Sequence, residues 1–70
     1  MKQNSIDKKY RELNDYIRGE MRRKKITQEK AANWLNLSRA SLSYRLNGKI
    51  EWSLREILSL FELLGVTEWK

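Results

Sequence analysis

The side chains best suited to binding chemistry gather in one short segment, residues 35–49, which reads LNLSRASLSYRLNGK. This segment contains lysine, arginine, serine, asparagine and tyrosine but no acidic residue, although the whole chain contains 9 of them. Its polar side chains carry positive charge or donate hydrogen bonds, so an anionic partner meets no repulsion there. The composition therefore predicts a surface that binds a partner rich in negative charge.

The chain has little that could support catalysis or bind a metal. It lacks histidine and cysteine, and it has no glycine-rich phosphate loop. The carboxylates of its N-terminal segment are scattered among basic residues, which is typical of a solvated helix surface. We therefore expect a protein that is not an enzyme and that binds no metal, cofactor or small-molecule ligand.

Length and charge narrow the class of protein further. The 70 residues suffice for one domain, residues 1–70, and the net charge of +6 favours an anionic partner such as nucleic acid or an acidic membrane surface. The absence of cysteine is typical of a reducing compartment, so we expect a cytoplasmic protein. The longest apolar stretch, residues 57–66, is much shorter than a membrane span of roughly 20 residues. We expect no membrane association.

Helical periodicity extends along the whole chain, without proline or the alternation typical of strands. In the N-terminal segment, apolar residues recur every three or four positions and predict a helix from Ser5 or Asp7 to about Lys24. The residues of this stripe are Ile6, Tyr10, Leu13, Ile17 and Met21. The expected fold is therefore an all-α domain of four to five helices.

Two short helices joined by a three-residue turn are predicted next. Thr27 is a favourable N-cap residue directly before a predicted helix over residues 28–35. Ser38 is likewise a favourable N-cap residue for a predicted helix that runs to about Asn47. Two short helices with such a turn form a helix-turn-helix, here at about residues 27–47.

The run ITQEKAANWLNLSRASLSYRLNGKIEWSLREILSLFELLGVT resembles the Cro and C1-type repressor family of phage and bacterial regulators. The likeness extends from about Leu13 to Val66. The matching positions open the first short helix, fill the turn, and line and end the second. They are Thr27, Gln28, Ala32, Leu37, Ser38, Leu42, Leu46, Asn47 and Gly48.

This resemblance implies a lambda repressor-like DNA-binding domain that regulates transcription, such as a phage or bacterial repressor. Its recognition helix, residues 38–47, would enter the major groove of a double-stranded DNA operator. At 100° per residue, the side of this helix away from Leu42 and Leu46 corresponds to the family's DNA-facing positions. The residues expected to contact bases are Arg39, Ala40, Ser43 and Tyr44.

Phosphate contacts are expected near the two helix starts and at the end of the recognition helix. The residues expected to make them are Lys25, Thr27, Gln28, Ser41, Asn47 and Lys49. Arg45 falls outside the outward arc of the recognition helix, and we expect it to turn away from the groove.

Other functions stay open at this point. A protein-interaction module with the same fold, such as an anti-repressor or an antitoxin, would bind a protein partner through the helix over residues 54–64, but it would not need an acid-free segment. Binding of RNA or a membrane by charge alone lacks a base-stacking sheet or a basic amphipathic helix. Trp34 also has two interpretations, packing over the small Ala31, which we expect, or exposure to a partner.

The apolar pattern of the last predicted helix indicates the oligomeric state of the protein. Ser53 and Glu56 have the spacing of a capping box for a helix over residues 54–64, and residues 66–70 look like the start of a fifth element, with Thr67 as a possible N-cap. The residues of the expected buried stripe of the helix over residues 54–64 are Ile57, Leu58, Phe61 and Leu64. Because further apolar residues lie outside this stripe, we predict a homodimer. Its contact is centred on Leu60, Leu63, Val66 and Trp69. The alternative is that the fifth helix covers these residues within one chain.

Overall fold

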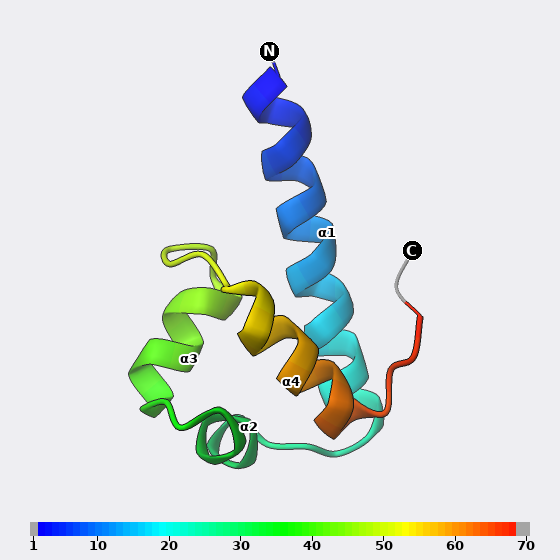
Figure 1. Cartoon of the computed structure of the whole chain (residues 1–70), viewed down its shortest axis with the longest axis vertical. Coiled ribbons are helices and arrows are strands. Elements are labelled where there is room, and N and C mark those ends of the chain that lie inside the picture. The colour runs from blue at the N-terminus through cyan, green and yellow to red at the C-terminus, as the bar shows by residue number, and fades with distance from the viewer. Residues whose placement is uncertain (1, 69–70) are drawn as a thin grey trace.

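The chain folds into four α-helices, with no strand among residues 2–68, the part that the computed structural model describes. The helices are α1 (Lys2–Arg23), α2 (Gln28–Leu35), α3 (Arg39–Leu46) and α4 (Leu54–Leu64). Figure 1 shows α1 as the longest element, with α2 near its C-terminal end and α3 and α4 beside it. The all-α prediction is confirmed for this part of the chain. No fifth helix begins between residues 65 and 68.

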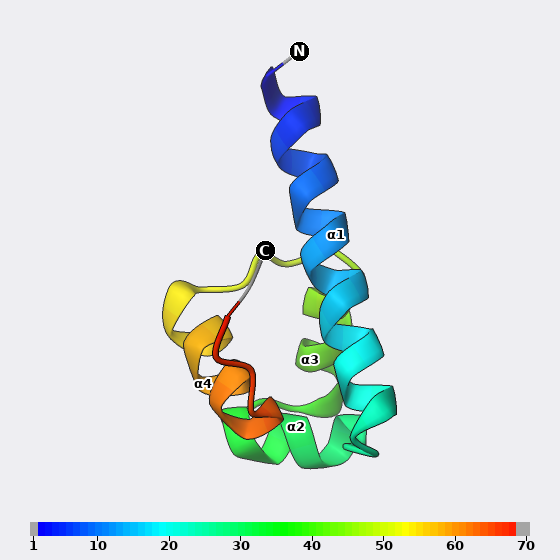
Figure 2. The same ribbon diagram turned by 90° about the vertical axis from the view of Figure 1, so that its right-hand side faces the viewer.

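α1 begins at Lys2, earlier than predicted, because residues 2–6 include neither proline nor glycine to interrupt a helix. Its N-terminal part extends beyond the other helices in Figures 1 and 2. Ile6 lies on this extension and is 62% exposed. The predicted apolar stripe is therefore buried only farther along α1, where Ile17 and Met21 belong to the core.

The predicted caps fix the starts of the two short helices. The Thr27 hydroxyl accepts a hydrogen bond from the Lys30 amide (3.1 Å), and the Ser38 hydroxyl accepts one from the Ser41 amide (3.0 Å). Between the helices, Asn36 adopts a left-handed conformation with φ of 61°, which asparagine tolerates better than most residues. These local interactions set the ends of α2 and α3 and the turn between them.

The capping box at the start of α4 is confirmed. The Ser53 hydroxyl accepts from the Glu56 amide, and the Glu56 carboxylate accepts from the Ser53 amide, both at 3.0 Å. Gly65 ends the helix with φ of 71°, a conformation in which a side chain would be strained. α4 therefore has the predicted bounds.

The core lies where α2 meets the inward sides of the other helices. α2 packs against both α3 and α4, and its residues Ala31 and Ala32 are almost completely buried. Small side chains at these positions let neighbouring helices approach α2 closely. The buried hydrophobic residues are Ile17, Met21, Ala31, Ala32, Leu42, Leu46, Trp52, Leu60 and Leu64.

α4 turns a different side toward the core from the one predicted. Leu60 and Leu64 are 0% and 1% exposed, whereas Leu54 and Leu58 are 75% and 60% exposed. The predicted burial of Leu58 is therefore wrong. Leucines occur on several sides of this helix, so periodicity alone leaves its orientation open.

The predicted dimer contact is wrong at Leu60 for the same reason. Leu60 is a core residue of a single chain, and Leu63 and Val66 are half-buried against that core. Trp69, the fourth predicted contact, lies outside the described residues. A contact between copies through α4 would need the opposite side of the helix.

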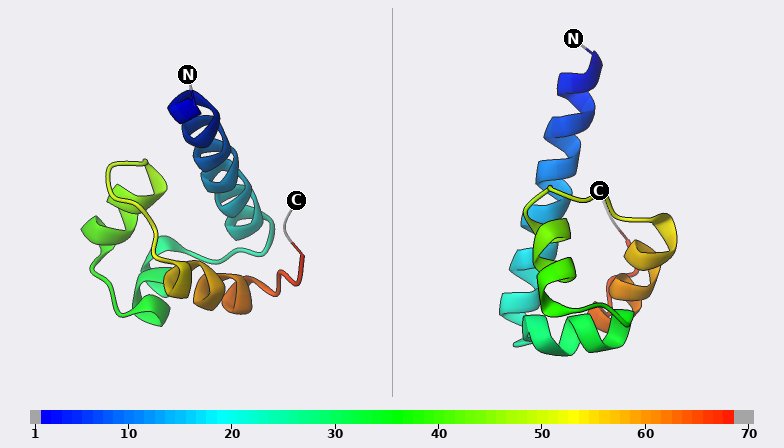
Figure 3. Two further views of the ribbon diagram at one scale, coloured as in Figure 1. Left: turned by 45° about the horizontal axis from the view of Figure 1, so that its top comes forward. Right: turned by 90° about the vertical axis from the view of Figure 1, so that its left-hand side faces the viewer.

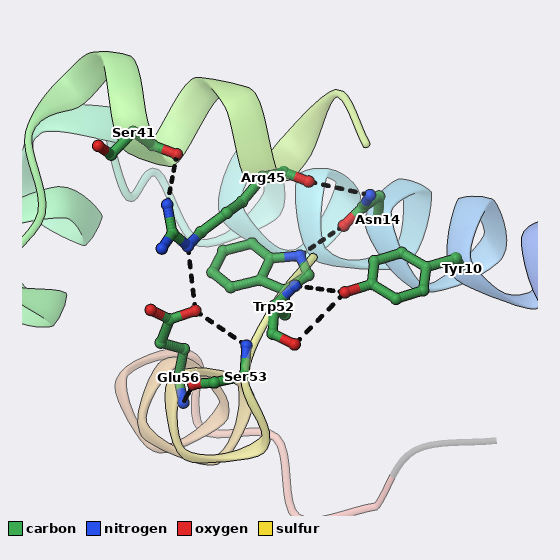
Figure 4. Close-up of polar contacts among 7 residues, drawn as sticks. All are labelled: Tyr10, Asn14, Ser41, Arg45, Trp52, Ser53 and Glu56. Atoms are coloured by element: carbon green, nitrogen blue, oxygen red, sulfur yellow. Dashed lines mark hydrogen bonds and ion pairs between the residues drawn. The ribbon is translucent and has the colours of Figure 1, made fainter. Parts of the chain in front are cut away.

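A polar network joins α1 to the segment between α3 and α4 (Figure 4). The Trp52 indole Nε1 donates to Asn14 Oδ1 (2.7 Å), and Asn14 Nδ2 donates to the Arg45 carbonyl oxygen (3.2 Å). The Tyr10 hydroxyl accepts a hydrogen bond from the Trp52 amide, and burial raises the pKa of Tyr10. The network holds the end of α3 in place relative to α1.

Candidate nucleic-acid interface

α3 presents one side to the core and the other to the surface. Leu42 and Leu46 face inward and are buried. In Figure 3 (right), α3 lies toward the viewer, in front of α1 and above α2. Its exposed residues are Arg39, Ala40 and Tyr44, and its half-buried residues are Ser41, Ser43 and Arg45. The four residues with predicted base contacts therefore all reach the surface.

The Arg39 guanidinium is free to meet a partner. Within residues 6–68 it forms no hydrogen bond or ion pair. It lies in the first turn of α3, which contains no acidic residue. An arginine in this state can pair through two N–H groups with O6 and N7 of a guanine.

Tyr44 and Lys49 form a second part of this surface. The Lys49 ammonium lies 5.9 Å from the centroid of the Tyr44 ring, within the range of a cation–π contact. The Lys49 amide also donates to the Tyr44 carbonyl oxygen at 2.8 Å. The chain thus folds back after α3 and holds a positive charge beside an exposed ring.

Arg18 of α1 reaches the C-terminal end of α3, a contact that the sequence interpretation missed. Its Nη2 donates to the Leu46 carbonyl oxygen (2.6 Å) and to Asn47 Oδ1 (2.7 Å). Asn47 Nδ2 in turn donates to Ser43 Oγ (3.3 Å), and Arg18 forms an ion pair with Asp15 (3.5 Å). Arg18 and Asn47 are 29 positions apart, so no local pattern signals their contact.

The start of α2 lies close to the same arginine. Gln28, the first residue of α2, is exposed and lines a groove together with Arg18 and Arg22 of α1 and Leu46 of α3. Two guanidinium groups and the free N–H groups of a helix start favour an anion in such a groove. The structure thus brings the predicted phosphate contact Gln28 to the end of α3.

The other predicted phosphate contacts are more dispersed. Lys25 is exposed in the turn before α2, and the Thr27 hydroxyl is engaged in its cap. Ser41 lies on the flank of α3 that carries Arg45 (Figure 4), and its carbonyl oxygen accepts from Arg45 Nη1 (3.1 Å). Ser41 is about 120° around the helix from Asn47. The structure therefore does not group Ser41 with the contacts at the end of α3.

Arg45 turns away from the exposed side of α3, as predicted. Its Nε donates to Glu56 of α4 at 3.0 Å, and the Arg45 side chain is largely buried. Its charge is neutralised within the chain. Arg45 therefore has a structural role, unlike Arg39.

Two further kinds of site find no support in the described part of the chain. Within residues 2–68, no three His, Cys, Asp or Glu side chains gather closely enough to hold a metal ion. Over the same residues, no helix combines the length and the apolar character needed to cross a bilayer. The exposed side of α3 carries no acidic residue, and the groove beside it is lined by Arg18 and Arg22, so both could bind an anionic partner.

The model of one protein family, described as "Protein of unknown function (DUF739)", matches residues 8–70. The matched region contains α2, α3 and α4 entirely, together with most of α1. Neither the curated proteins nor the solved structures give a match. The candidate interface lies wholly inside the matched region.

Proposed function

The chain belongs to the DUF739 family, and we propose that it binds double-stranded DNA sequence-specifically through the exposed side of α3. The proposal includes a lambda repressor-like fold, in which α2 and α3 form the helix-turn-helix and α3 enters the major groove. Regulation of transcription follows from occupation of an operator within a promoter.

One observation supports this proposal above the others: the exposed side of α3 carries an unpaired arginine and no acidic side chain. An α-helix such as α3 is about 10–12 Å across with its side chains, and the major groove of B-DNA is about 12 Å wide. Leu42 and Leu46 anchor the helix to the core on the opposite side. A carboxylate on the exposed side would be repelled by the phosphates that border the groove.

The residues of this side have distinct roles in the proposal. Arg39 reads a guanine through its O6 and N7, and Ala40 packs against a thymine methyl group. Tyr44 packs on or hydrogen-bonds to base edges. Ser43 already accepts a hydrogen bond from Asn47, and its own hydroxyl proton is available to a base acceptor.

The groove beside α3 supplies contacts to the DNA backbone. Gln28, Arg18 and Arg22 line it together, and Lys49 is exposed beside Tyr44. Contacts of this kind fix the position of a recognition helix and carry no sequence information themselves. We therefore assign affinity to these residues and base preference to α3.

The rival function is a protein-interaction module of the anti-repressor or antitoxin kind. The exposed leucines of α4, Leu54 and Leu58, are the observation in its favour. A protein partner on α4 would place no requirement on the charges of α3. The charge pattern of α3 therefore favours DNA.

Selection of binding sites from a pool of random duplexes tests the proposed function. We expect enrichment of one motif that contains a guanine, and retardation of the selected duplex at protein concentrations that leave random duplexes free. Arg39→Ala should lose this preference, while Lys8→Ala, an exposed basic residue on the extension of α1, is the matched control that should keep it. A folded wild-type protein that enriches no motif would overturn the proposal.

A further inference from the structure

The outward side of α4 is an apolar surface that no other part of residues 2–68 covers. Leu54 and Leu58 lie on it one turn apart, and both are well exposed. A groove along this side is lined by Leu54, Arg55, Leu58, Ser59 and Glu62. We call these five residues the α4 face.

Trp34 of α2 borders the α4 face. Its indole Nε1 donates to the Ser59 carbonyl oxygen at 2.8 Å, and 48% of its surface is exposed. The expectation that Trp34 is largely packed over Ala31 is therefore wrong. The hydrogen bond holds the ring beside α4 with one side open, so Trp34 extends the apolar surface.

The charges of the α4 face are arranged symmetrically about its middle. Arg55 and Glu62 are seven residues apart, so they point in directions about 20° apart and are separated by about 10 Å along the helix. Leu58 and Ser59 lie midway between them. Within residues 6–68, neither the Arg55 guanidinium nor the Glu62 carboxylate forms a hydrogen bond or an ion pair. Both charges are therefore available to a partner.

We propose that the α4 face binds the α4 face of a second copy of this chain, with the two helices antiparallel. A two-fold axis that passes between Leu58 and Ser59 sets Arg55 of each copy against Glu62 of the other, which forms two ion pairs. Around the helix, Leu54 and Leu58 lie on the same side of the line that runs from Arg55 to Glu62. The two-fold axis sets this side of one copy against the same side of the other. The leucines of the two copies therefore come together.

Other arrangements satisfy this surface less well. Parallel helices would set Arg55 against Arg55 and Glu62 against Glu62, which are repulsive pairs. A partner whose surface carries charges of only one sign would be attracted by one of the two residues, Arg55 or Glu62, and repelled by the other. The antiparallel pair is the arrangement in which both charges and both leucines find partners.

The dimer is expected to be weak. The α4 face occupies only one side of an 11-residue helix. The area that it can bury is therefore smaller than the roughly 800 Å² per partner of a standard interface. Association should therefore depend on protein concentration. It does not depend on DNA or on α3, so failure of the dimer would leave the proposed function untouched.

Sedimentation equilibrium of charge-reversal variants tests the proposal. The wild-type mass should rise from that of a monomer toward that of a dimer over a concentration series into the millimolar range. Arg55→Glu and Glu62→Arg should each weaken association by at least about tenfold, because both ion pairs become repulsive pairs. The double variant, which exchanges the two charges, should restore association, as should an equimolar mixture of the two single variants.

Lys8→Glu is the matched control, because it makes the same change of charge on the extension of α1 and should leave association unchanged. Arg55 and Glu62 are exposed, so circular dichroism should show every variant folded. A wild-type protein that stays monomeric over the whole series would overturn the proposal. So would a dimer that the single reversals leave intact, or one that the exchange of charges fails to restore.

Discussion

Arg45 Nε donates to Glu56 Oε1 at 3.0 Å, and this ion pair ties α3 to the first turn of α4. The two side chains are only 15% and 21% exposed, so water screens the pair incompletely. The same Glu56 carboxylate accepts from the Ser53 amide, and Arg45 Nη1 donates to the Ser41 carbonyl oxygen. The pair thus fixes α3 on the core without using any residue of its exposed side.

Glu56→Gln should reduce the free energy of unfolding by about 1 to 3 kcal/mol. Glutamine still serves as the acceptor in the capping box, so the loss reports the missing counter-charge of a largely buried Arg45. Urea unfolding at neutral pH measures it. Glu12→Gln, on an exposed part of α1, is the control and should change the free energy by less than about 0.5 kcal/mol. An unchanged midpoint for Glu56→Gln would show that the pair adds nothing to stability.

The same carboxylate should make stability depend on acidity. Burial raises the pKa of Glu56, but hydrogen bonds from Arg45 and Ser53 outweigh burial and hold its pKa below the ordinary value of 4.5. Because the folded-state pKa is the lower one, the contribution to stability is complete above the unfolded-state pKa and is lost as the pH falls through the folded-state value. Hydrogen bonds from Lys24 and Arg23 also lower the pKa of Glu20, which acts in the same direction.

We therefore expect the urea midpoint of the wild-type protein to fall as the pH is lowered below 4.5. The fall should be smaller in Glu56→Gln, and the part that remains should come from Glu20. An identical acid dependence in both proteins would exclude Glu56 as its source.

Leu60→Ala and Leu58→Ala form a matched pair that tests the orientation of α4. Leu60 is 0% exposed, and its truncation should reduce the free energy of unfolding by about 2 to 5 kcal/mol. Leu58 is 60% exposed, and its truncation in a dilute monomer should cost less than about 0.5 kcal/mol. Thermal or urea unfolding at low protein concentration measures both. The reverse order would mean that α4 packs through the side predicted from its periodicity.

Lys49→Ala should weaken binding to the selected duplex and to random duplexes by the same factor. Loss of one phosphate contact should also lower the slope of log K against log salt concentration by about 1. Titrations at several salt concentrations measure that slope, with Lys8→Ala as the control. A slope equal to that of the wild type would place Lys49 outside the interface.

The features that the sequence predicted correctly depend on local interactions. Thr27 and Ser38 each cap a helix through an amide three residues ahead, and the capping box of α4 joins Ser53 to Glu56. Such interactions involve neighbours along the chain, so residue type and spacing suffice to predict them. The exposed side of α3 was predictable as well, because Leu42 and Leu46 mark the opposite side.

The features that the sequence did not reveal depend on contacts between distant segments. The orientation of α4 is decided by its packing on α2, which favours Leu60 over Leu58 although both are leucines on the same helix. Arg18 is one basic residue among several on α1, and only the fold brings it to Asn47. Trp34 likewise finds its partner on α4, 25 positions away.

The central claim, that α3 reads bases, is tested most directly by a double-mutant cycle between Arg39 and each guanine of the selected duplex. Replacement of the contacted guanine pair should cost the wild-type protein about 1 to 3 kcal/mol of binding free energy. Arg39→Ala should bind the original and the altered duplex equally, because the contact is already lost. An Arg39→Ala protein that binds every duplex more weakly by one common factor, and still prefers each guanine as the wild type does, would contradict the claim.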